Sequence, residues 1–161
     1  MSSGNTAKDF ESIKAGLGQT IGYAAISGLR TEIAQERRVR LVMPLADIHK
    51  NHVGAAYAGS IFVIGEIAAA GIVRCTYGSK NYIPILSKAE ITYIRPAKED
   101  LVVDVSMTQE EAEEKIAYVQ KNGKGKIPLQ IPIQDASGRI VAEMSISMYL
   151  IKIQNKETEN D

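Results

Sequence analysis

Residues 61–73 read IFVIGEIAAAGIV, thirteen residues in which Glu66 is the single charged side chain. The segment is too short to span a bilayer, which requires about 20 residues, and it is too long for an ordinary strand. It is typical of a helix that is apolar on every face, and we expect such a helix to be buried on every face. Ser60 or Gly59 is the expected N-terminal cap of this helix.

The segments on both sides of this helix alternate between apolar and polar residues, as half-buried strands do. Before the helix, strands are expected over Leu29–Ile33 and Val39–Leu45, joined by the turn Gln35–Arg37. Four more strands are expected after it, over residues 89–93, 101–108, 127–133 and 140–150. Pro128 and Pro132 share one parity, which predicts an edge of the sheet or a gap in its ladder on that side.

Two further helices are expected outside the apolar segment. Lys8–Leu17 has the spacing of a short amphipathic helix. Thr108 and Glu111 form a capping box for an inserted helix over 109–122, which Gly123 ends. The elements together predict an α+β protein, in which a mostly antiparallel sheet curls around one buried helix. A second copy of the chain would close the face of the helix that one sheet leaves open.

The composition limits the classes of partner. A length of 161 residues favours a single domain over 1–161, with loose tails at 1–6 and 154–161. Nineteen basic and nineteen acidic residues argue against nucleic acid and against a polybasic membrane-surface role. Cys75 is the single cysteine, so no internal disulfide forms, and we expect it in the core. No signal peptide is recognised, and we therefore expect a cytoplasmic protein without a membrane partner.

Glu66 is the residue whose position requires an explanation. Its neighbours one helical turn away are Phe62, Val63, Ala69 and Ala70, which are all apolar. A buried carboxylate is costly unless it is paired, protonated or functional. Two interpretations stay open: Glu66 is a structural group that meets a cation, a backbone donor or a subunit seam, or it is a catalytic group.

The small residues before the helix favour the second interpretation. Ala58, Gly59 and Ser60 carry little bulk, so a ligand can approach the free N–H groups and the positive partial charge of the helix start. Such donors would hold the oxyanion that develops on a carbonyl. Glu66, two turns along, would attack the same carbonyl or activate water.

Residues 51–66, NHVGAAYAGSIFVIGE, resemble the signature of hotdog-fold acyl-CoA thioesterases of the phenylacetate-pathway (PaaI-like) group. That signature reads roughly N-x-x-G-x-x-H-G-G-x-x-F-x-L-A-[DE]. The positions that match in register are Asn51, Gly54, Gly59, Phe62 and Glu66. Residues 90–98, EITYIRPAK, are similar to the strand of the same group that ends in R-P-A, and the resemblance covers residues 29–151.

The resemblance implies the hotdog fold, a homodimer or dimer of dimers, and active sites at the subunit interface. It makes Glu66 the nucleophile or general base and the N–H of Ala58 the donor that polarises the thioester carbonyl, with Asn51 and Tyr57 orienting that carbonyl or the water. Arg95 and Lys98 would meet coenzyme A phosphates. Further substrate-binding candidates are Gly59, His52 and Ser87, the last as a supporting hydroxyl.

The resemblance implies no cofactor, because coenzyme A is part of the substrate. No metal is expected either, since Asp47, His49 and His52 make only a weak metal pattern without cysteine. Both histidines are instead expected to be solvated, or His52 to line the mouth of the site.

Two positions depart from the family signature. Tyr57 stands where the family has histidine, and Ala58 stands where it has the first glycine. The backbone N–H survives at Ala58, provided that this residue needs no positive φ. Besides a thioesterase, the sequence is compatible with a non-catalytic hotdog protein that binds acyl-CoA or a lipid-like ligand. A dehydratase of the same fold is disfavoured, because no Asp/His pair of the hydratase arrangement is visible.

Overall fold

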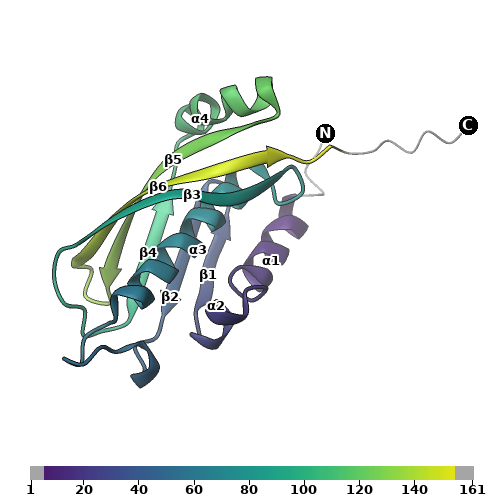
Figure 1. The fold of residues 1–161 in the computed structure, drawn as a ribbon. Coiled ribbons are helices and arrows are strands. Elements are labelled where there is room, and N and C mark those ends of the chain that lie inside the picture. Colours follow the sequence, from purple (N-terminus) through teal and green to yellow (C-terminus); the bar gives the residue numbers. More distant parts are fainter. Residues whose placement is uncertain (1–5, 155–161) are drawn as a thin grey trace, which may run out of the picture.

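The computed structural model describes residues 6–154, with side chains from Asp9 onward (Figure 1). The tails predicted at 1–6 and 154–161 therefore lie almost wholly outside the described residues. The helices are α1 (Thr6–Gly16), α2 (Gly22–Ile26), the 3-10 turn η1 (Asp47–His49), α3 (Ala58–Tyr77) and α4 (Gln109–Asn122). The strands are β1 (Arg30–Gln35), β2 (Arg38–Met43), β3 (Tyr82–Tyr93), β4 (Leu101–Ser106), β5 (Lys124–Asp135) and β6 (Ile140–Lys152).

The six strands form one antiparallel sheet in the order β1-β2-β4-β5-β6-β3. Figure 1 shows this sheet curving around α3, which packs against strands from both halves of the sheet. The predicted α+β arrangement, a curved antiparallel sheet wrapped around one long helix, is confirmed. The alternation explains the sheet's inner face: Leu41 and Met43 of β2 lie opposite Val103 and Leu101 of β4, and all four are buried.

Close packing of α3 on the sheet depends on a glycine. A Cβ at Gly65 would lie 2.8 Å from the terminal methyl of Met144 and 3.3 Å from Ile133. The helix therefore approaches β5 and β6 more closely than any larger residue allows. Ile64, Ile67 and Ile72 of α3 are almost fully buried.

The long helix differs from the prediction in three respects. It has 20 residues and begins at Ala58, so Ser60 and Gly59 lie inside its first turn and do not cap it. Its N-cap is Tyr57, which makes no side-chain capping bond. It is also not buried on every face: half-buried residues form an open stripe along it, namely Phe62, Val63, Glu66, Ala70 and Arg74.

The true length of α3 removes the argument that it is too short for a bilayer. With 20 residues and a mean hydropathy of 1.6, it is long and apolar enough to cross one. However, 61% of it is buried inside the protein, as the core helix of a globular fold would be. Its packing against the sheet accounts for its apolar composition.

The gap predicted from the two prolines lies between β4 and β5. These strands pair only at Leu101–Asp135 and Val102–Gln134, while β5 pairs with β6 along nearly its whole length. The carbonyl of Pro128 points away from β6 and accepts a 2.9 Å hydrogen bond from Lys115 of α4. That helix begins at the predicted Thr108–Glu111 capping box and ends at Gly123, as expected.

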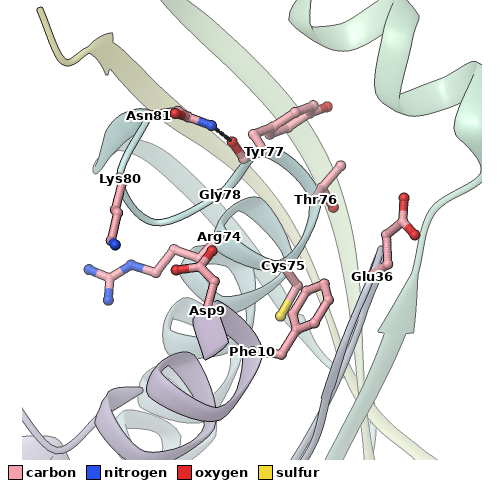
Figure 2. Close-up of a pocket in the computed structure, with 10 residues that line it drawn as sticks. All are labelled: Asp9, Phe10, Glu36, Arg74, Cys75, Thr76, Tyr77, Gly78, Lys80 and Asn81. Atoms are coloured by element: carbon pink, nitrogen blue, oxygen red, sulfur yellow. Dashed lines mark hydrogen bonds between the residues drawn. The ribbon is translucent and has the colours of Figure 1, made fainter. Parts of the chain in front are cut away.

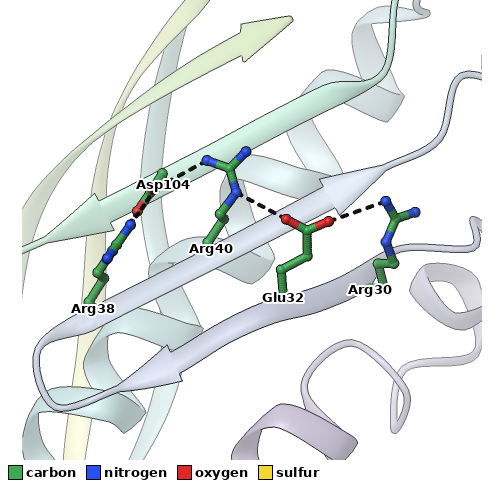
Figure 3. A network of polar contacts seen from close by, with 5 residues as sticks. All are labelled: Arg30, Glu32, Arg38, Arg40 and Asp104. Carbon is green, nitrogen blue, oxygen red and sulfur yellow. Dashed lines mark hydrogen bonds and ion pairs between the residues drawn. The ribbon is translucent and has the colours of Figure 1, made fainter. Parts of the chain in front are cut away.

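Charged side chains form a cross-strand network on the outer face of β1, β2 and β4 (Figure 3). Asp104 accepts two bonds from Arg38, at 2.9 and 3.0 Å, and one from Arg40 at 3.2 Å. Arg40 also donates to Glu32, which pairs with Arg30. Hydrogen bonds from Arg38 lower the pKa of Asp104, and those from Arg40 lower the pKa of Glu32. The network covers the convex side of the sheet, opposite α3.

The two edges of the sheet are not alike. The α1 helix packs beside β1 and covers that edge. The other edge is β3, which pairs only with β6 within residues 6–154. An uncovered edge strand of 12 residues offers a row of backbone donors and acceptors to another chain.

Candidate active site at the start of the central helix

The loop that precedes α3 is held by the side chain of Asn51. The Oδ1 of Asn51 accepts hydrogen bonds from the N–H groups of Val53 and Ala55, at 3.0 and 3.1 Å. Gly54 completes the turn with a φ of +77°, a region that favours glycine. The amide NH₂ of Asn51 has no hydrogen-bond partner among residues 6–154, so it is free to donate to a ligand.

The first turn of α3 presents two unused backbone donors. The N–H groups of Ser60 and Ile61 both bond to the carbonyl of Tyr57, at 2.9 and 3.1 Å. Those of Ala58 and Gly59 have no partner in the described part of the chain, as is usual for the first residues of a helix. Ala58 does not have a positive φ. Alanine in place of glycine therefore leaves the backbone of the family motif unstrained.

The end of β3 lies against this turn. The Tyr93 hydroxyl donates a 3.0 Å hydrogen bond to the carbonyl of Ala58, and burial raises the pKa of Tyr93, with a further contribution from nearby Tyr57. The R-P-A turn is held against the loop that precedes α3, because the Ala56 N–H donates a 2.8 Å hydrogen bond to the Ala97 carbonyl.

These groups surround one pocket. Its volume is about 350 Å³, and Asn51, Ala58, Tyr93 and Arg95 line it together with apolar side chains. Three residues predicted from the sequence, Asn51, Ala58 and Arg95, thus come together in space.

Glu66 lies on the open stripe of α3. It is half-buried and has neither a hydrogen bond nor an ion pair with any residue from 6 to 154. Burial raises the pKa of its carboxyl group above the ordinary value of 4.5. Within the described chain, no cation and no backbone donor satisfies the Glu66 carboxyl group. The structural interpretation of Glu66 is therefore left with a contact at a subunit seam.

Glu66 and Ala58 of one chain do not face the same point. They are eight residues apart on one continuous helix, a rise of about 12 Å along its axis. A carbonyl within hydrogen-bond distance of the Ala58 N–H is therefore out of reach of the Glu66 carboxylate of the same chain. The expectation that the two groups of one chain bracket a carbonyl is wrong.

Comparison with known families identifies the chain. A family model described as a domain of unknown function, DUF4442, matches residues 11–150. The chain belongs to the DUF4442 family. It has no significant match among curated proteins.

Solved structures place this DUF4442 protein among the hotdog-fold thioesterases. A Pseudomonas aeruginosa protein of unknown function, named a probable thioesterase, is 28% identical, with a TM-score of 0.80 over 89% of this chain and 95% of that one. The thioesterase PA1618 of the same organism shares the fold at 12% identity, with a TM-score of 0.69 over 90% and 95%. The phenylacetic acid degradation protein PaaI of Thermus thermophilus does so at 11% identity, with a TM-score of 0.59 over 79% and 96%. The hotdog fold and the resemblance to the PaaI-like group are thus confirmed.

The remaining candidate residues of the DUF4442 site lie around its rim or away from it. The ring of Tyr57 lies over Gly59, where a Cβ would come within 2.6 Å of it. His52 and Lys98 are exposed and do not line the pocket. The Ser87 hydroxyl, at an irregularity of β3, donates to the Ser147 carbonyl at 2.9 Å.

His49 differs from its prediction because it is buried, with only 4% of its surface exposed. Its Nδ1 accepts from the Ala46 N–H at 2.9 Å, and its Nε2 lies 2.7 Å from the Ser27 carbonyl. It therefore ties η1 to the end of α2. Within residues 6–154, no group of three His, Cys, Asp or Glu side chains is placed to hold a metal ion.

From the sequence, Tyr93 could either line an acyl pocket or pack in the sheet, with packing favoured; in the structure it lines the pocket beside Ala58. The available signal was its position two residues before the R-P-A motif, where β3 returns to the loop that precedes α3.

A separate pocket of about 320 Å³ lies between α1 and the C-terminal end of α3 (Figure 2). Figure 2 shows Cys75 beside Phe10 at its base, and Asp9 bonds to Ser79 at its edge. Cys75 is 3% exposed, and burial raises the pKa of its thiol to about 11. The thiol is therefore protonated near neutral pH and is a core group, as predicted.

Proposed function

We propose that this protein is an acyl-CoA thioesterase, which hydrolyses a thioester to a free acid and coenzyme A. The observation that carries the proposal is Glu66, an unpaired, half-buried carboxylate with a raised pKa on the open stripe of the core helix. The likeness to solved thioesterases and the free donors at the start of α3 support it.

In the proposed reaction, Glu66 takes a proton from a water molecule whose oxygen attacks the thioester carbonyl carbon. The Ala58 N–H stabilises the resulting oxyanion, and Asn51 and Tyr57 orient the carbonyl or the water. The carbon–sulfur bond then breaks, and the proton held by Glu66 passes to the departing thiolate. A carboxylate whose pKa is raised by burial suits this exchange, because it is a stronger base than an ordinary glutamate. Direct attack by Glu66 on the carbonyl is the covalent variant.

Two copies of the chain are needed for this chemistry. The 12 Å rise, about eight residues of helix, separates Glu66 from Ala58 in one chain, whereas a two-fold contact brings different residues of two chains together. The uncovered edge of β3 and the open stripe of α3 are the surfaces available for that contact. We therefore propose a homodimer, or a dimer of dimers, in which Glu66 of one subunit works with Ala58 of the other.

Coenzyme A would leave the site past the R-P-A turn. Arg95 lines the pocket beside Ala58, and Lys98 follows at the exposed end of the turn. Neither makes an ion pair with the residues of 6–154, so both cations are available to phosphates. The overall charge balance does not oppose this, because a small anionic ligand needs only local cations.

The direct test is a hydrolysis screen of the purified protein against aryl, short-chain and long-chain acyl-CoA thioesters. Release of free thiol is the measurement, and the proposal expects turnover of at least one class. Binding of acyl-CoA without hydrolysis of any class would contradict it and favour a non-catalytic ligand-binding protein. The replacement of the family histidine by Tyr57 is the observation that favours this second candidate.

Tyr93 provides a further prediction for the proposed reaction. Its hydroxyl polarises the peptide between Ala58 and Gly59. The free Gly59 N–H of that peptide would be a second donor to the oxyanion, beside the Ala58 N–H. Loss of a hydrogen bond worth about 1 kcal/mol predicts that Tyr93→Phe lowers kcat about fivefold. KM should stay unchanged, since the ring remains. Tyr118→Phe on the exposed face of α4 is the control, and a Tyr93→Phe effect confined to KM would contradict the assignment.

A further inference from the structure

A second pocket lies on the opposite flank of the open stripe of α3. Its volume is about 250 Å³, and it is enclosed by α2, η1, the end of β2 and α3. The apolar side chains that line it are Tyr23, Ile26, Met43, Ile48 and Val63. Three of them are largely exposed although apolar: Tyr23 at 71%, Ile26 at 77% and Ile48 at 69%. Large apolar side chains gathered at the mouth of a pocket are typical of a binding surface.

The polar groups of Ser27, His49 and Ser60 in the wall are already satisfied, whereas the hydroxyl of the largely exposed Tyr23 has no hydrogen bond within residues 6–154. Ser60 Oγ donates to the His49 carbonyl at 3.2 Å. Ser27 Oγ donates to the Ala24 carbonyl at 2.5 Å. Because Nδ1 of His49 accepts from a backbone N–H, its proton is on Nε2, which donates to the Ser27 carbonyl. The lining thus offers no unused donor from these three residues, and a polar ligand group would be desolvated there without compensation.

The pocket opens beside Glu66. Val63, in its wall, precedes Glu66 by three residues on the same side of α3, a separation of about 5–6 Å between Cβ atoms. The start of α3, with Asn51 and Arg95, lies on the other flank. A thioester carbonyl held at Glu66 therefore has an apolar pocket one helical turn away, on the flank opposite Asn51 and Arg95 of the same chain.

We propose that this pocket receives the hydrocarbon chain of a straight-chain acyl thioester whose carbonyl lies at Glu66. The inference rests on the proposed function and adds the class of acyl group. The ligand part that enters is an alkyl chain without polar substituents. Ile26 and Ile48 form the mouth, and Val63 sets the width of the passage from Glu66.

The first measurement is kcat/KM over straight-chain acyl-CoA substrates from four to twelve carbons. Each methylene that enters the pocket should raise kcat/KM about three- to fourfold until the pocket is filled. Val63→Phe, which narrows the passage, should move this maximum to shorter chains. Ile151→Phe, at a partly exposed position of β6 outside this pocket and outside the open stripe, is the control. Equal chain-length profiles for the two variants would overturn the inference and leave the thioesterase proposal standing.

The second measurement does not depend on turnover. We would measure the binding of decanoate to the Glu66→Gln protein by calorimetry. Val63→Phe and the exposed-site variant Ile48→Ser should each weaken this binding at least about tenfold, and the control Ile151→Phe should not. If this pattern appears and no acyl-CoA is hydrolysed, the pocket stands and the thioesterase proposal fails. If decanoate does not bind and Ile26→Asp converts a dimer to a monomer, the rim is a subunit contact and the inference is overturned.

Discussion

Glu66→Gln is expected to reduce thioester hydrolysis by at least about a hundredfold, the lower end of what a general base contributes. The amide is nearly the same size as the carboxyl group but cannot accept the proton of the attacking water. Release of free thiol from the best substrate of the screen is the measurement. Glu143→Gln, on the exposed face of β6, is the matched control and should keep full activity. Full turnover by Glu66→Gln would remove the carboxylate from the mechanism.

The same substitution should stabilise the protein at neutral pH. Burial raises the folded-state pKa of Glu66 above its ordinary value of 4.5, so the folded chain holds this proton more tightly than the unfolded chain. The Glu66 carboxyl group therefore destabilises the folded state most at pH values above its folded-state pKa, where it is charged. Glu66→Gln should accordingly melt at a higher temperature than the wild type at neutral pH. The difference should close as the pH falls below about 4.5, where both states are protonated.

The sign of the pH dependence of activity follows from the same shift. A general base acts as the carboxylate, so kcat should fall as the pH drops through a pKa that lies above the ordinary range of glutamate. If the fall of kcat at low pH instead has its midpoint at or below pH 4.5, a group other than Glu66 controls the pH dependence.

Ala58→Pro is expected to lower kcat about 10²–10³-fold, as the loss of one oxyanion-hole donor does. Proline removes the N–H at this position and puts a ring carbon in its place. The first residue of a helix tolerates proline, and Tyr57 already has the extended conformation, φ −64° and ψ 141°, that a residue before proline prefers. Stability should therefore be unchanged in thermal melts. Gln109→Pro makes the same change at the first residue of α4 and should leave kcat intact.

Mixed dimers test whether the two groups come from different subunits. Co-expressed Ala58→Pro and Glu66→Gln chains form heterodimers in which one site combines an intact Ala58 with the partner subunit's intact Glu66. Random pairing should restore about a quarter of wild-type activity, because half of the dimers hold one good site out of two. No restoration in a verified heterodimer would mean that one chain supplies both groups, or that Ala58 has no role.

The sheet and its inserted helix could be predicted from local patterns. The alternation in β2, β4, β5 and β6 and the capping box at Thr108 are local signals with a direct physical meaning. The proline parity in β5 also predicted a gap, since a missing N–H is a property of the residue itself.

The elements that sequence reasoning missed depend on tertiary contacts. The α2 helix has only five residues and no side-chain cap, and His49 secures it through a backbone carbonyl 22 residues away in the chain. The predicted start of α3 is three residues late, because Ser60 and Gly59 are residue types that favour an N-cap although both lie inside the first turn. The open stripe of α3 could not be predicted from a segment that is apolar on every face. The geometry of the sheet decides which face of the helix stays uncovered.

The candidate site was predicted in part. The family motif identified Asn51, Ala58 and Arg95, which the structure brings into one pocket. Tyr93 was missed because its role depends on one hydrogen bond between residues 35 positions apart. The distance between Ala58 and Glu66 follows from the rise of a continuous helix that includes both residues. It was not predicted, because the helix was expected to begin after Ala58.

The two-pair contact between β4 and β5 divides the described sheet into two ribbons. On one side of it β1, β2 and β4 form a ribbon, with η1 following β2 in the chain, and on the other side β5, β6 and β3 form a second ribbon. The ladder between the ribbons is short, so the packing of both on α3 has a large share in holding them together. Glu66 lies on the open stripe of this same helix. A substitution on the buried face of α3 is therefore expected to disturb both ribbons and the position of Glu66 together.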